Sequence, residues 1–356
     1  MADSAEIQFD PTNHPHRRRN PLTDEYVLVS PHRNRRPWLG QTEPPQPSNL
    51  PEYDPQCYLC PGNARAGGHK NDIYAHTMIF ENDYAAVLPP PAPVAPLPLI
   101  RSSLPSLCKE AATLPISDIE RIIDDWCTIY RDRGAQDAVN YVQIFENKGA
   151  MMGCSNPHPH GQVWSLSEIP SIPAKELANL KRYSLTDVSS SAPRGPHNRP
   201  CMLCEYAHFE AGVPYADGRT VSQNEHWIAV VPWWAVWPFE VLRTPHSLSP
   251  QCQPCPNQRP AVLPYKRHIP SIAHLTPAEK LAFAHILSSI TIRYDNLFSC
   301  SFAYSMGIHQ RPVPPSPSSA PTPEDEDDEN VAHLHLHFAP PLLRSANVRK
   351  FLVGFE

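Results

Sequence analysis

The chain is organised around the stretch Gly153-Cys154-Ser155-Asn156-Pro157-His158-Pro159-His160-Gly161-Gln162, residues 153–162. Each proline disfavours the helical conformation for the residue before it, so Asn156 and His158 are expected to be extended. In an extended chain, residues two apart point to the same face, about 6–7 Å from each other. His158 and His160 therefore face one site, and Gln162 continues the spacing with a neutral amide. Such an arrangement suits an imidazole held next to a phosphate.

The flanks of this stretch favour a ligand site over the plainer alternative, a histidine-rich loop that merely tolerates prolines. Gly153 and Gly161 lack a β-carbon, so a ligand can approach the main chain closely. The polar run Glu146-Asn147-Lys148-Gly149 precedes the stretch, and the apolar, strand-like pair Val163-Trp164 follows it. The segment is therefore the first candidate for an active site.

Residues 146–164 closely resemble the active-site segment of the galactose-1-phosphate uridylyltransferase family, a branch of the histidine-triad superfamily. The resemblance implies that His160, the second histidine of the run, is the nucleophile. Gln162 at the end of the triad goes with nucleotidyl transfer in this family, whereas a histidine there goes with hydrolysis. The catalytic residues so implied are His160, Gln162 and Ser155, and the substrate-binding residues of this segment are Asn147, Gly153, Cys154, Ser155 and Gln162.

The reaction implied by the resemblance is transfer of a uridylyl group from UDP-glucose to galactose 1-phosphate. Neutral imidazole is a nucleophile and also a good leaving group from its phosphoramidate, so a uridylyl-histidine intermediate is expected. Two alternatives stay open. One is another histidine-triad nucleotidyltransferase, such as a dinucleoside polyphosphate phosphorylase, and the other is a catalytically impaired metal-binding homologue.

The composition argues against several classes of partner. A net charge of −6 provides no basic field for nucleic acid or for an acidic membrane surface. No apolar run approaches the roughly 18 residues of a membrane span. The start of the chain also lacks the charged and apolar regions of a signal peptide. We therefore expect a cytoplasmic enzyme without nucleic-acid or membrane partners.

Two Cys-x-x-Cys pairs, Cys57/Cys60 and Cys201/Cys204, stand out among the 10 cysteines. In a cytosolic enzyme this spacing indicates metal binding or redox chemistry before disulfides. Two thiolates at this spacing can bind one Zn²⁺, which then needs two further ligands.

The family resemblance makes Cys57 and Cys60 zinc ligands, completed by His158 and by one residue between them. At the position where relatives usually have histidine, this chain has Glu110, with Cys108 nearby as a competitor. We expect Glu110 to be the fourth ligand, because a carboxylate can also coordinate zinc. A bound but weaker zinc is therefore predicted.

The second half of the chain repeats the order of features found in the first. Each Cys-x-x-Cys pair is followed by a strand-like run (residues 80–89 and 223–232), a helical pattern (115–134 and 276–295) and a histidine-rich strand. An internal duplication of about 150 residues explains this repetition. We expect an α+β fold of two tandem histidine-triad-like units with antiparallel sheets packed against helices. The catalytic unit would span residues 1–184, the linker 185–200 and the second unit 201–356.

Local signals refine this outline. Residues 24–30 alternate as a strand, residues 141–145 are expected to form the strand after the helix at 115–134, and residues 173–183 form a short polar helix that bears Glu176. Ser117 and Glu120 have the spacing of a capping box, with Ser117 as the N-cap of the helix at 115–134.

The closing strand of the second half is His333-Leu334-His335-Leu336-His337-Phe338. With a period of two, its histidines share one face of a sheet, which by itself indicates no more than a polar face. The resemblance implies an iron or zinc site here, and three imidazoles with one carboxylate suit either ion. Its ligands would be Glu176, His309, His335 and His337, and His333 falls outside the match.

Other substrate contacts are implied by resemblance alone. The basic run at residues 30–38, otherwise a solvated turn, would bring Arg33 and Arg36 to the phosphate of a neighbouring subunit in a homodimer. Asn82 and Asp83, otherwise a turn before a strand, would bind uridine and ribose. The last residues match the sugar-phosphate-binding end, through Lys350, Phe351, Phe355 and Glu356. Relatives usually have tyrosine at the position of Phe355.

The 45 prolines are unevenly distributed. They concentrate in residues 89–107, 244–263 and 311–330, where we expect disordered insertions that bury no packed face. Compared with the family pattern, the end at Glu356 is expected to be a truncation.

Overall fold

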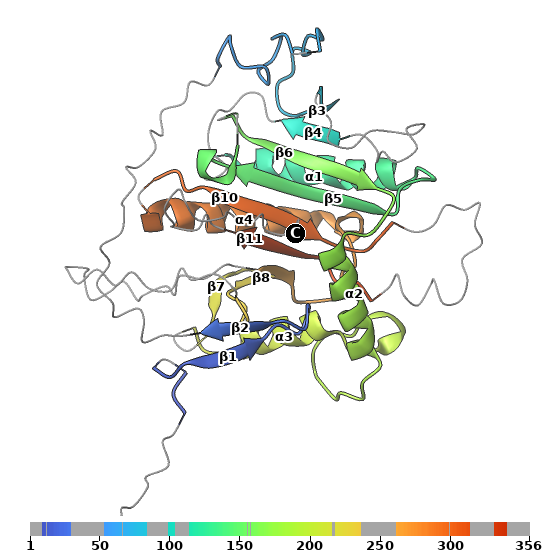
Figure 1. The fold of residues 1–356 in the computed structure, drawn as a ribbon, viewed down its shortest axis with the longest axis vertical. Helices are drawn as coiled ribbons and strands as arrows, with labels where there is room; N and C mark the ends of the chain where they lie inside the picture. The colour runs from blue at the N-terminus through green and yellow to red at the C-terminus, as the bar shows by residue number, and fades with distance from the viewer. Residues whose placement is uncertain are drawn as a thin grey trace, which may run out of the picture.

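The computed structural model describes residues 9–11, 13–29, 53–65, 67–83, 99–103, 114–154, 156, 158–215, 218–235, 261–298, 300–313 and 331–339. Its centre is an antiparallel nine-stranded sheet in the order β3-β4-β6-β5-β10-β11-β9-β8-β7 (Figure 1). The strands are β3 (Met78–Glu81), β4 (Leu99–Ser103), β5 (Tyr141–Lys148), β6 (His160–Leu166), β7 (Thr220–Gln223), β8 (Trp227–Val230), β9 (Ala261–Pro264), β10 (Tyr304–His309) and β11 (His335–Ala339). The expected α+β fold with antiparallel strands is confirmed.

The sheet is symmetric about the pairing of β5 with β10, in which Phe145 lies opposite Gly307. Outward from this pair the first half supplies β6, β4 and β3, and the second half supplies β11, β9 and β8. Each half also runs strand, strand, helix, strand, strand along the chain. This order agrees with an internal duplication. The sheet is continuous across both halves, so the boundary at residues 185–200 stays a prediction.

One face of the sheet is covered by α1 (Ile116–Gly134) and α4 (Pro277–Phe298), which also contact each other (Figure 1). Their apolar residues recur at helical spacing, and Ile123 and Ile290 are buried in a core shared with the sheet. The helix expected at residues 115–134 is confirmed. Its predicted N-cap is wrong, because the N-cap is Pro115 and Ser117 lies inside the first turn. The proline φ of −56° already suits a helix start.

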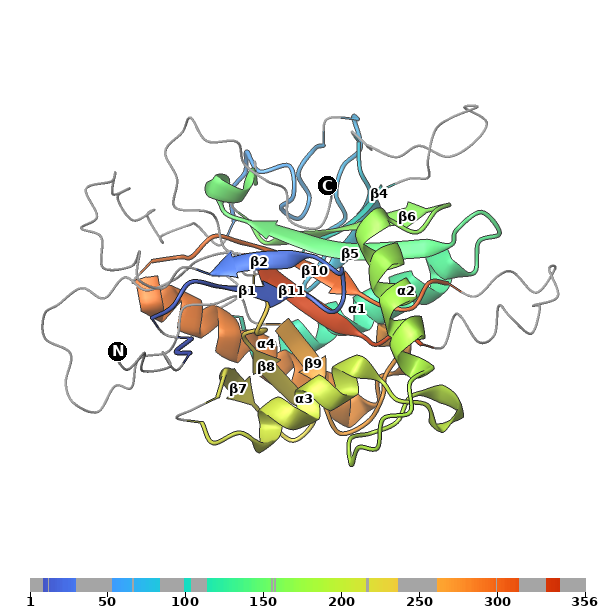
Figure 2. The same ribbon diagram turned by 60° about the horizontal axis from the view of Figure 1, so that its bottom comes forward.

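The other elements lie toward the second half of the sheet (Figure 2). They are α2 (Ser171–Ser184), α3 (Met202–Gly212) and the hairpin β1 (His16–Arg19) and β2 (Tyr26–Val29). Of the 3-10 helices, Ala150–Met152 follows β5 in the first half, and Pro196–Asn198 and Ile272–His274 precede α3 and α4. The hairpin turn docks on α2, where Asn179 donates to the Leu22 carbonyl at 2.7 Å. Glu176 of α2, which the family resemblance makes a metal ligand, is buried.

Part of each segment expected to be a disordered insertion is ordered in the structure. Residues 99–103 form β4, which is hydrogen-bonded between β3 and β6. Residues 261–263 belong to β9, and Val313 is buried in the core. Ladder pairing and apolar burial therefore order parts of segments that composition assigned to loops. The strand expected at residues 80–89 also differs, because β3 ends at Glu81.

Within the described residues, no helix has both the length and the apolar character needed to cross a membrane.

Candidate active site and metal centres

The candidate site lies on the face of the sheet opposite α1 and α4, called here the site face. Val163 of β6, Ile144 of β5 and Leu336 of β11 are buried in the core beneath these helices. Because side chains alternate along a strand, their neighbours point the other way. The site face therefore carries His160 and Gln162 of β6, Asn147 of β5, Ser305 and His309 of β10, and His335 and His337 of β11.

His160, the predicted nucleophile, is buried at the start of β6. Its Nδ1 lies 2.8 Å from the carbonyl oxygen of His158. A carbonyl only accepts, so Nδ1 carries the proton and Nε2 carries the lone pair. The backbone carbonyl of His158 is therefore the acceptor that orients the His160 ring.

The loop before β6 depends on glycine. Gly149 and Gly153 have φ values of 86° and 80°, which favour residues without a β-carbon. The turn they make brings the Cys154 N–H to the Gly149 carbonyl at 3.3 Å. The expected phosphate donor at Cys154 is therefore engaged in a long hydrogen bond inside the loop. Asn147, one strand away from β6, contacts the hydroxyl of Ser305.

The first candidate metal centre comprises Cys57, Cys60 and His158, all buried, with donor atoms within 4.8 Å of one another. Cys60 Sγ lies 3.2 Å from His158 Nδ1. The backbone N–H of Leu59 donates to Cys57 Sγ at 3.3 Å, and Asn156 Nδ2 donates to the same sulfur at 3.3 Å. Sulfurs that accept N–H groups are suited to the thiolate state in which cysteine binds a metal.

The two thiols of this centre differ in acidity. Burial opposes ionisation of Cys57, but hydrogen bonds from His158 and Asn156 outweigh it and lower the pKa of Cys57 to about 7. Burial raises the pKa of Cys60. Three donors are thus present for a tetrahedral ion, and the expected fourth donors, Glu110 and Cys108, lie outside the described residues.

The second candidate metal centre joins α2 to β10 and β11. Glu176 Oε2 lies 2.7 Å from His309 Nδ1 and 3.6 Å from His335 Nε2. Glu176 Oε1 lies 3.8 Å from His337 Nε2. These are the four ligands that the resemblance implies, and the structure brings them together. Within the described residues, His335 Nε2 is buried without a hydrogen-bond partner, as expected of an atom that binds an ion.

Electrostatics also favour a cation at the second centre. Burial opposes ionisation of Glu176, but His309 and His335 hold the pKa of its carboxyl well below the usual range. Burial opposes protonation of His335, but Glu176 raises the pKa of its imidazole. A buried carboxylate surrounded by imidazoles is a suitable ligand set for a divalent iron or zinc ion.

Sequence reasoning missed two further candidate ligands, His268 and His333. The structure places both beside Cys201 and Cys204 in a third group of potential donors. A signal was present, because a Cys-x-x-Cys pair needs two more ligands to complete a zinc site. His268 was not singled out because it lies in a loop without a motif of its own.

The other predicted substrate residues are less clearly placed. Asp83 directly follows the edge strand β3, where its carboxylate lies 3.9 Å from Arg65 Nε. The Arg65 guanidinium stacks on the Phe80 ring at 4.3 Å, so Asp83 faces a fixed positive charge. Asn82 lies beside it in the chain. The residues outside the described part of the chain are Arg33, Arg36, Ser155, Lys350, Phe351, Phe355 and Glu356.

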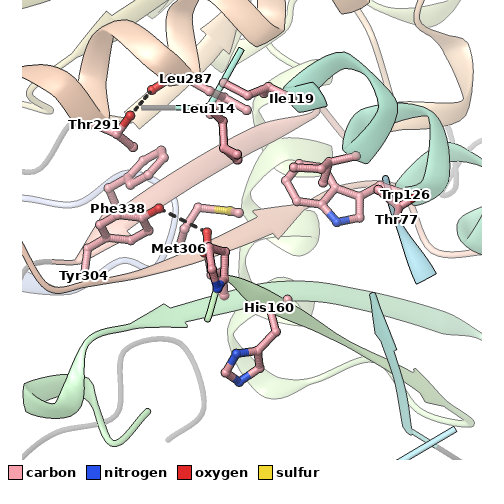
Figure 3. A pocket seen from close by; sticks show the side chains of 14 residues that line it. Thr77, Leu114, Ile119, Trp126, His160, Leu287, Thr291, Tyr304, Met306 and Phe338 are labelled. Carbon is pink, nitrogen blue, oxygen red and sulfur yellow. Dashed lines mark hydrogen bonds between the residues drawn. The ribbon is translucent and has the colours of Figure 1, made fainter. Parts of the chain in front are cut away.

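An internal cavity of about 60 Å³ lies between α1, α4 and the sheet (Figure 3). Its lining is mainly apolar and includes Glu146, which accepts a hydrogen bond from the Tyr304 hydroxyl at 3.1 Å. Burial raises the pKa of Glu146. The His160 ring points away from the labelled apolar side chains in Figure 3, so the nucleophile faces the site face rather than this cavity.

Comparison with known families identifies two matching family models. The model described as galactose-1-phosphate uridyl transferase, N-terminal domain, matches residues 7–96 and 103–170. The model of the C-terminal domain matches residues 181–254 and 260–356. Both describe parts of one class of enzyme, the uridyl transferases.

Full-length relatives agree with these matches. A galactose-1-phosphate uridylyltransferase of Cryptococcus neoformans is 44% identical over 97% of this chain and 85% of its own. The enzyme of Haemophilus influenzae is 42% identical over 98% and 90%, and that of Rattus norvegicus is 39% identical over 100% and 86%. The chain therefore belongs to the galactose-1-phosphate uridyl transferase family.

Solved structures share the fold. An ADP-glucose phosphorylase from Arabidopsis thaliana superposes with a TM-score of 0.66 at 19% identity, covering 94% of this chain and 92% of its own. A uridylyltransferase superposes with a TM-score of 0.61 at 23% identity, covering 94% and 90%.

Proposed function

We propose that the chain transfers a uridylyl group from UDP-glucose to galactose 1-phosphate, with His160 as the nucleophile. Relatives of this name cover nearly all of the chain at about two-fifths identity, for example 44% and 42%. The observation that carries the role of His160 is its Nδ1 contact of 2.8 Å with the His158 carbonyl. This contact selects the tautomer in which Nε2 is available for attack.

In the first step, Nε2 attacks the α-phosphorus of UDP-glucose, a P–N bond forms and the P–O bond to glucose 1-phosphate breaks. The positive charge that develops on the ring is stabilised through Nδ1–H by the His158 carbonyl. In the second step, a phosphate oxygen of galactose 1-phosphate attacks the same phosphorus and the P–N bond breaks. Gln162 and Ser155 are proposed to donate to the non-bridging oxygens, where charge redistributes, with Gly153 and Cys154 lining the phosphate site.

The first metal centre has a positioning role in this proposal. Cys57, Cys60 and His158, with Glu110 or Cys108, would hold Zn²⁺, which supplies a fixed tetrahedral anchor rather than an activated water. Anchoring His158 also anchors the carbonyl that orients His160. Hence the metal ligand and the nucleophile are coupled through two residues of backbone.

The second centre, Glu176 with His309, His335 and His337, would hold iron or zinc. A bound ion there supplies a structural charge that offsets the buried carboxylate. The ion ties α2 to the middle strands of the sheet, whose site face also carries Asn147.

The remaining substrate contacts are proposed from the family alignment. Asn82 and Asp83 bind uridine and ribose, and the guanidinium of Arg65 fixes the direction of Asp83. Arg33 and Arg36 reach the nucleotide phosphates of the partner in a cytoplasmic homodimer. The sugar phosphate is bound by Lys350, Phe351, Phe355 and Glu356.

The test is incubation of the purified chain with UDP-glucose alone, followed by intact mass measurement and peptide mapping. We expect one uridylyl group per chain, labile in acid and stable in alkali, as phosphoramidates are. His160→Gly should abolish it, and His285→Asn, at an exposed histidine of α4, should not. An adduct mapped to a different residue contradicts the assignment.

A phosphorylase with the same intermediate is distinguished in the next step. The isolated uridylyl-protein should be discharged by galactose 1-phosphate. Faster discharge by inorganic phosphate would instead support the phosphorylase alternative, and failure to form any adduct would support an impaired homologue.

A further inference from the structure

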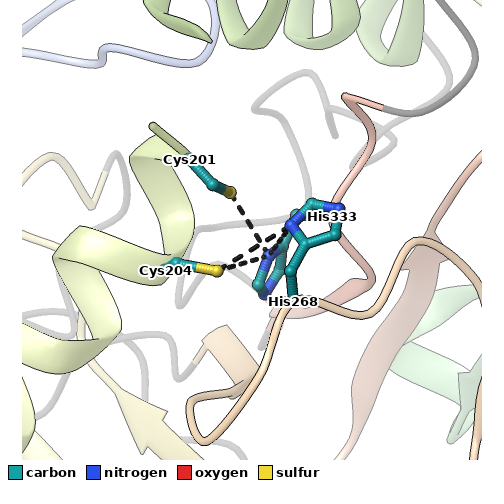
Figure 4. A group of neighbouring side chains, drawn as sticks. All are labelled: Cys201, Cys204, His268 and His333. Carbon is teal, nitrogen blue, oxygen red and sulfur yellow. Dashed lines mark hydrogen bonds between the residues drawn. The ribbon is translucent and has the colours of Figure 1, made fainter. Parts of the chain in front are cut away.

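A third group of potential metal ligands lies in the second half of the chain and shares no residue with the two centres named so far (Figure 4). His333 Nδ1 lies 3.5 Å from Cys201 Sγ and 3.4 Å from Cys204 Sγ. His268 Nδ1 lies 3.4 Å from His333 Nδ1 and 3.8 Å from Cys204 Sγ. All four donor atoms lie within 4.8 Å of one another.

These separations match the edges of a tetrahedron of donors around one zinc ion. With Zn–N bonds of about 2.0–2.1 Å and Zn–S bonds of about 2.3 Å, the edges are about 3.4 Å between nitrogens and about 3.6 Å between nitrogen and sulfur. The distance of 3.4 Å between the two imidazole nitrogens exceeds an ordinary hydrogen bond, in which the heavy atoms lie about 2.7–3.2 Å apart. The rings are therefore spaced as two ligands of a common ion.

Three segments that are distant in sequence converge at this group. Cys201 is the N-cap of α3 and Cys204 lies in its first turn, where the helix dipole favours thiolates. His268 lies between β9 and the 3-10 helix Ile272–His274, and His333 lies two residues before β11. The Leu334 N–H donates to the carbonyl of Ile269 at 2.7 Å, so backbone contacts already hold the last two segments together.

Burial and charge also agree with a metal. Cys201, Cys204 and His333 are buried and His268 is half-buried. Two thiolates and two neutral imidazoles cancel the charge of a divalent cation, so the complete site places no net charge in the interior. Four protein donors leave no open coordination position, as in structural zinc sites.

The internal repeat points to the same conclusion. His335 Nδ1 lies 2.7 Å from the His333 carbonyl, just as His160 Nδ1 lies 2.8 Å from the His158 carbonyl. His333 thus occupies in the second half the place that His158 occupies in the first, next to a Cys-x-x-Cys pair. The contact between a histidine Nδ1 and the carbonyl two residues earlier therefore occurs in both halves, at the nucleophile His160 and at His335 of the second metal centre.

We propose that Cys201, Cys204, His268 and His333 bind one Zn²⁺ in a closed, four-coordinate structural site. The ion fastens α3 and the loop that carries His268 to the start of β11. This site is independent of the transfer reaction, because none of its ligands is assigned to substrate.

The experiment counts zinc in the purified full chain and in variants. Zinc is measured by elemental mass spectrometry, and separately with a zinc-binding dye after a thiol-blocking reagent has released the metal. Cys201→Ser/Cys204→Ser and His333→Ala should each lose one equivalent of zinc relative to the parent. His333→Cys should retain it, because cysteine is also a zinc ligand. Cys127→Ser is the matched control, since Cys127 is a buried cysteine that donates to the Ile272 carbonyl.

A second measurement separates this site from the first centre. In a Cys57→Ser/Cys60→Ser chain reconstituted with Co²⁺, the thiolate-to-cobalt charge-transfer band should persist, because it then arises from Cys201 and Cys204. The proposal is overturned if that background shows no such band. It is also overturned if His333→Ala keeps as much zinc as His333→Cys.

Discussion

Gly149 joins β5 to the loop of the histidine motif, and one added methyl group there should lower stability through both backbone strain and a steric clash. Its φ of 86° and ψ of 151° lie in a region open essentially to glycine. A β-carbon here would also lie 2.7 Å from the β-carbon of Ala303, just before β10. Backbone strain of about 1–3 kcal/mol and overpacking of about 1–3 kcal/mol add, so Gly149→Ala should lower the free energy of unfolding by about 2–6 kcal/mol.

Gly153→Ala is the control variant that measures the cost of backbone strain without a steric clash. Gly153 has a φ of 80° and ψ of 13°, and among the described residues nothing lies within 4 Å of a β-carbon built there. Only the left-handed conformation is penalised, by about 1–2 kcal/mol. The double variant Gly149→Ala/Ala303→Gly removes the contact of 2.7 Å but leaves the Ala303 α-carbon at 3.3 Å, so it should recover part of the overpacking cost and none of the backbone strain.

Urea unfolding followed by tryptophan fluorescence measures all three variants against the parent. The reasoning is refuted if Gly149→Ala is no more destabilising than Gly153→Ala, or if the added Ala303→Gly change recovers nothing. The uridylylation rate of the folded Gly149→Ala chain should also fall, because the loop that it displaces carries the proposed phosphate donors.

Three further predictions concern the metal centres and the nucleotide site. In the metal-stripped chain, alkylation of Cys57 should be fast above about pH 7 and decline below it, because the pKa of Cys57 is lowered to about 7. Cys127 should stay unreactive at pH 8, because burial raises its pKa to about 11. A Cys57 profile centred near the ordinary thiol pKa would contradict this. Glu176→Gln removes one partner of a buried ion pair and should lower the free energy of unfolding by about 3–5 kcal/mol, as measured by thermal unfolding. It should also release the ion of the second centre, as measured by metal analysis. Retention of that ion would be evidence against the ligand set. Asp83→Ala should raise the KM for UDP-glucose with little change in kcat, and an unchanged KM would remove Asp83 from the nucleotide site.

Periodicity and motif spacing were sufficient for much of the fold. The helix at residues 115–134 follows from apolar residues at helical spacing, and the strands at residues 24–30 and 333–338 follow from alternation. The cap was misassigned because Ser117 has the right residue type, whereas the proline before the helix fixes the start through φ. Residues 99–103 were assigned to a disordered insertion because of the many prolines around them, although they include the apolar pair Leu99-Ile100. They form β4, which pairs with β3 on one side and β6 on the other.

The second metal centre could be anticipated, but the third group could not be completed from sequence. His309, His335 and His337 follow from strand period and family match, and Glu176 from the family alone. His268 and His333 become neighbours only through tertiary packing, since they are 65 residues apart. By contrast, the orientation of His160 by the His158 carbonyl is a local contact between residues two apart, and it recurs between His335 and His333.

The central pairing of β5 with β10 has a consequence for synthesis of the chain. The buried Gln143 amide donates to the Ile308 carbonyl across 165 residues at 3.0 Å, so the inner edge of β5 has no partner until β10 leaves the ribosome. Contacts at such sequence separation form slowly, and an unpaired strand edge is a template for aggregation. The first half should therefore depend on chaperones during translation.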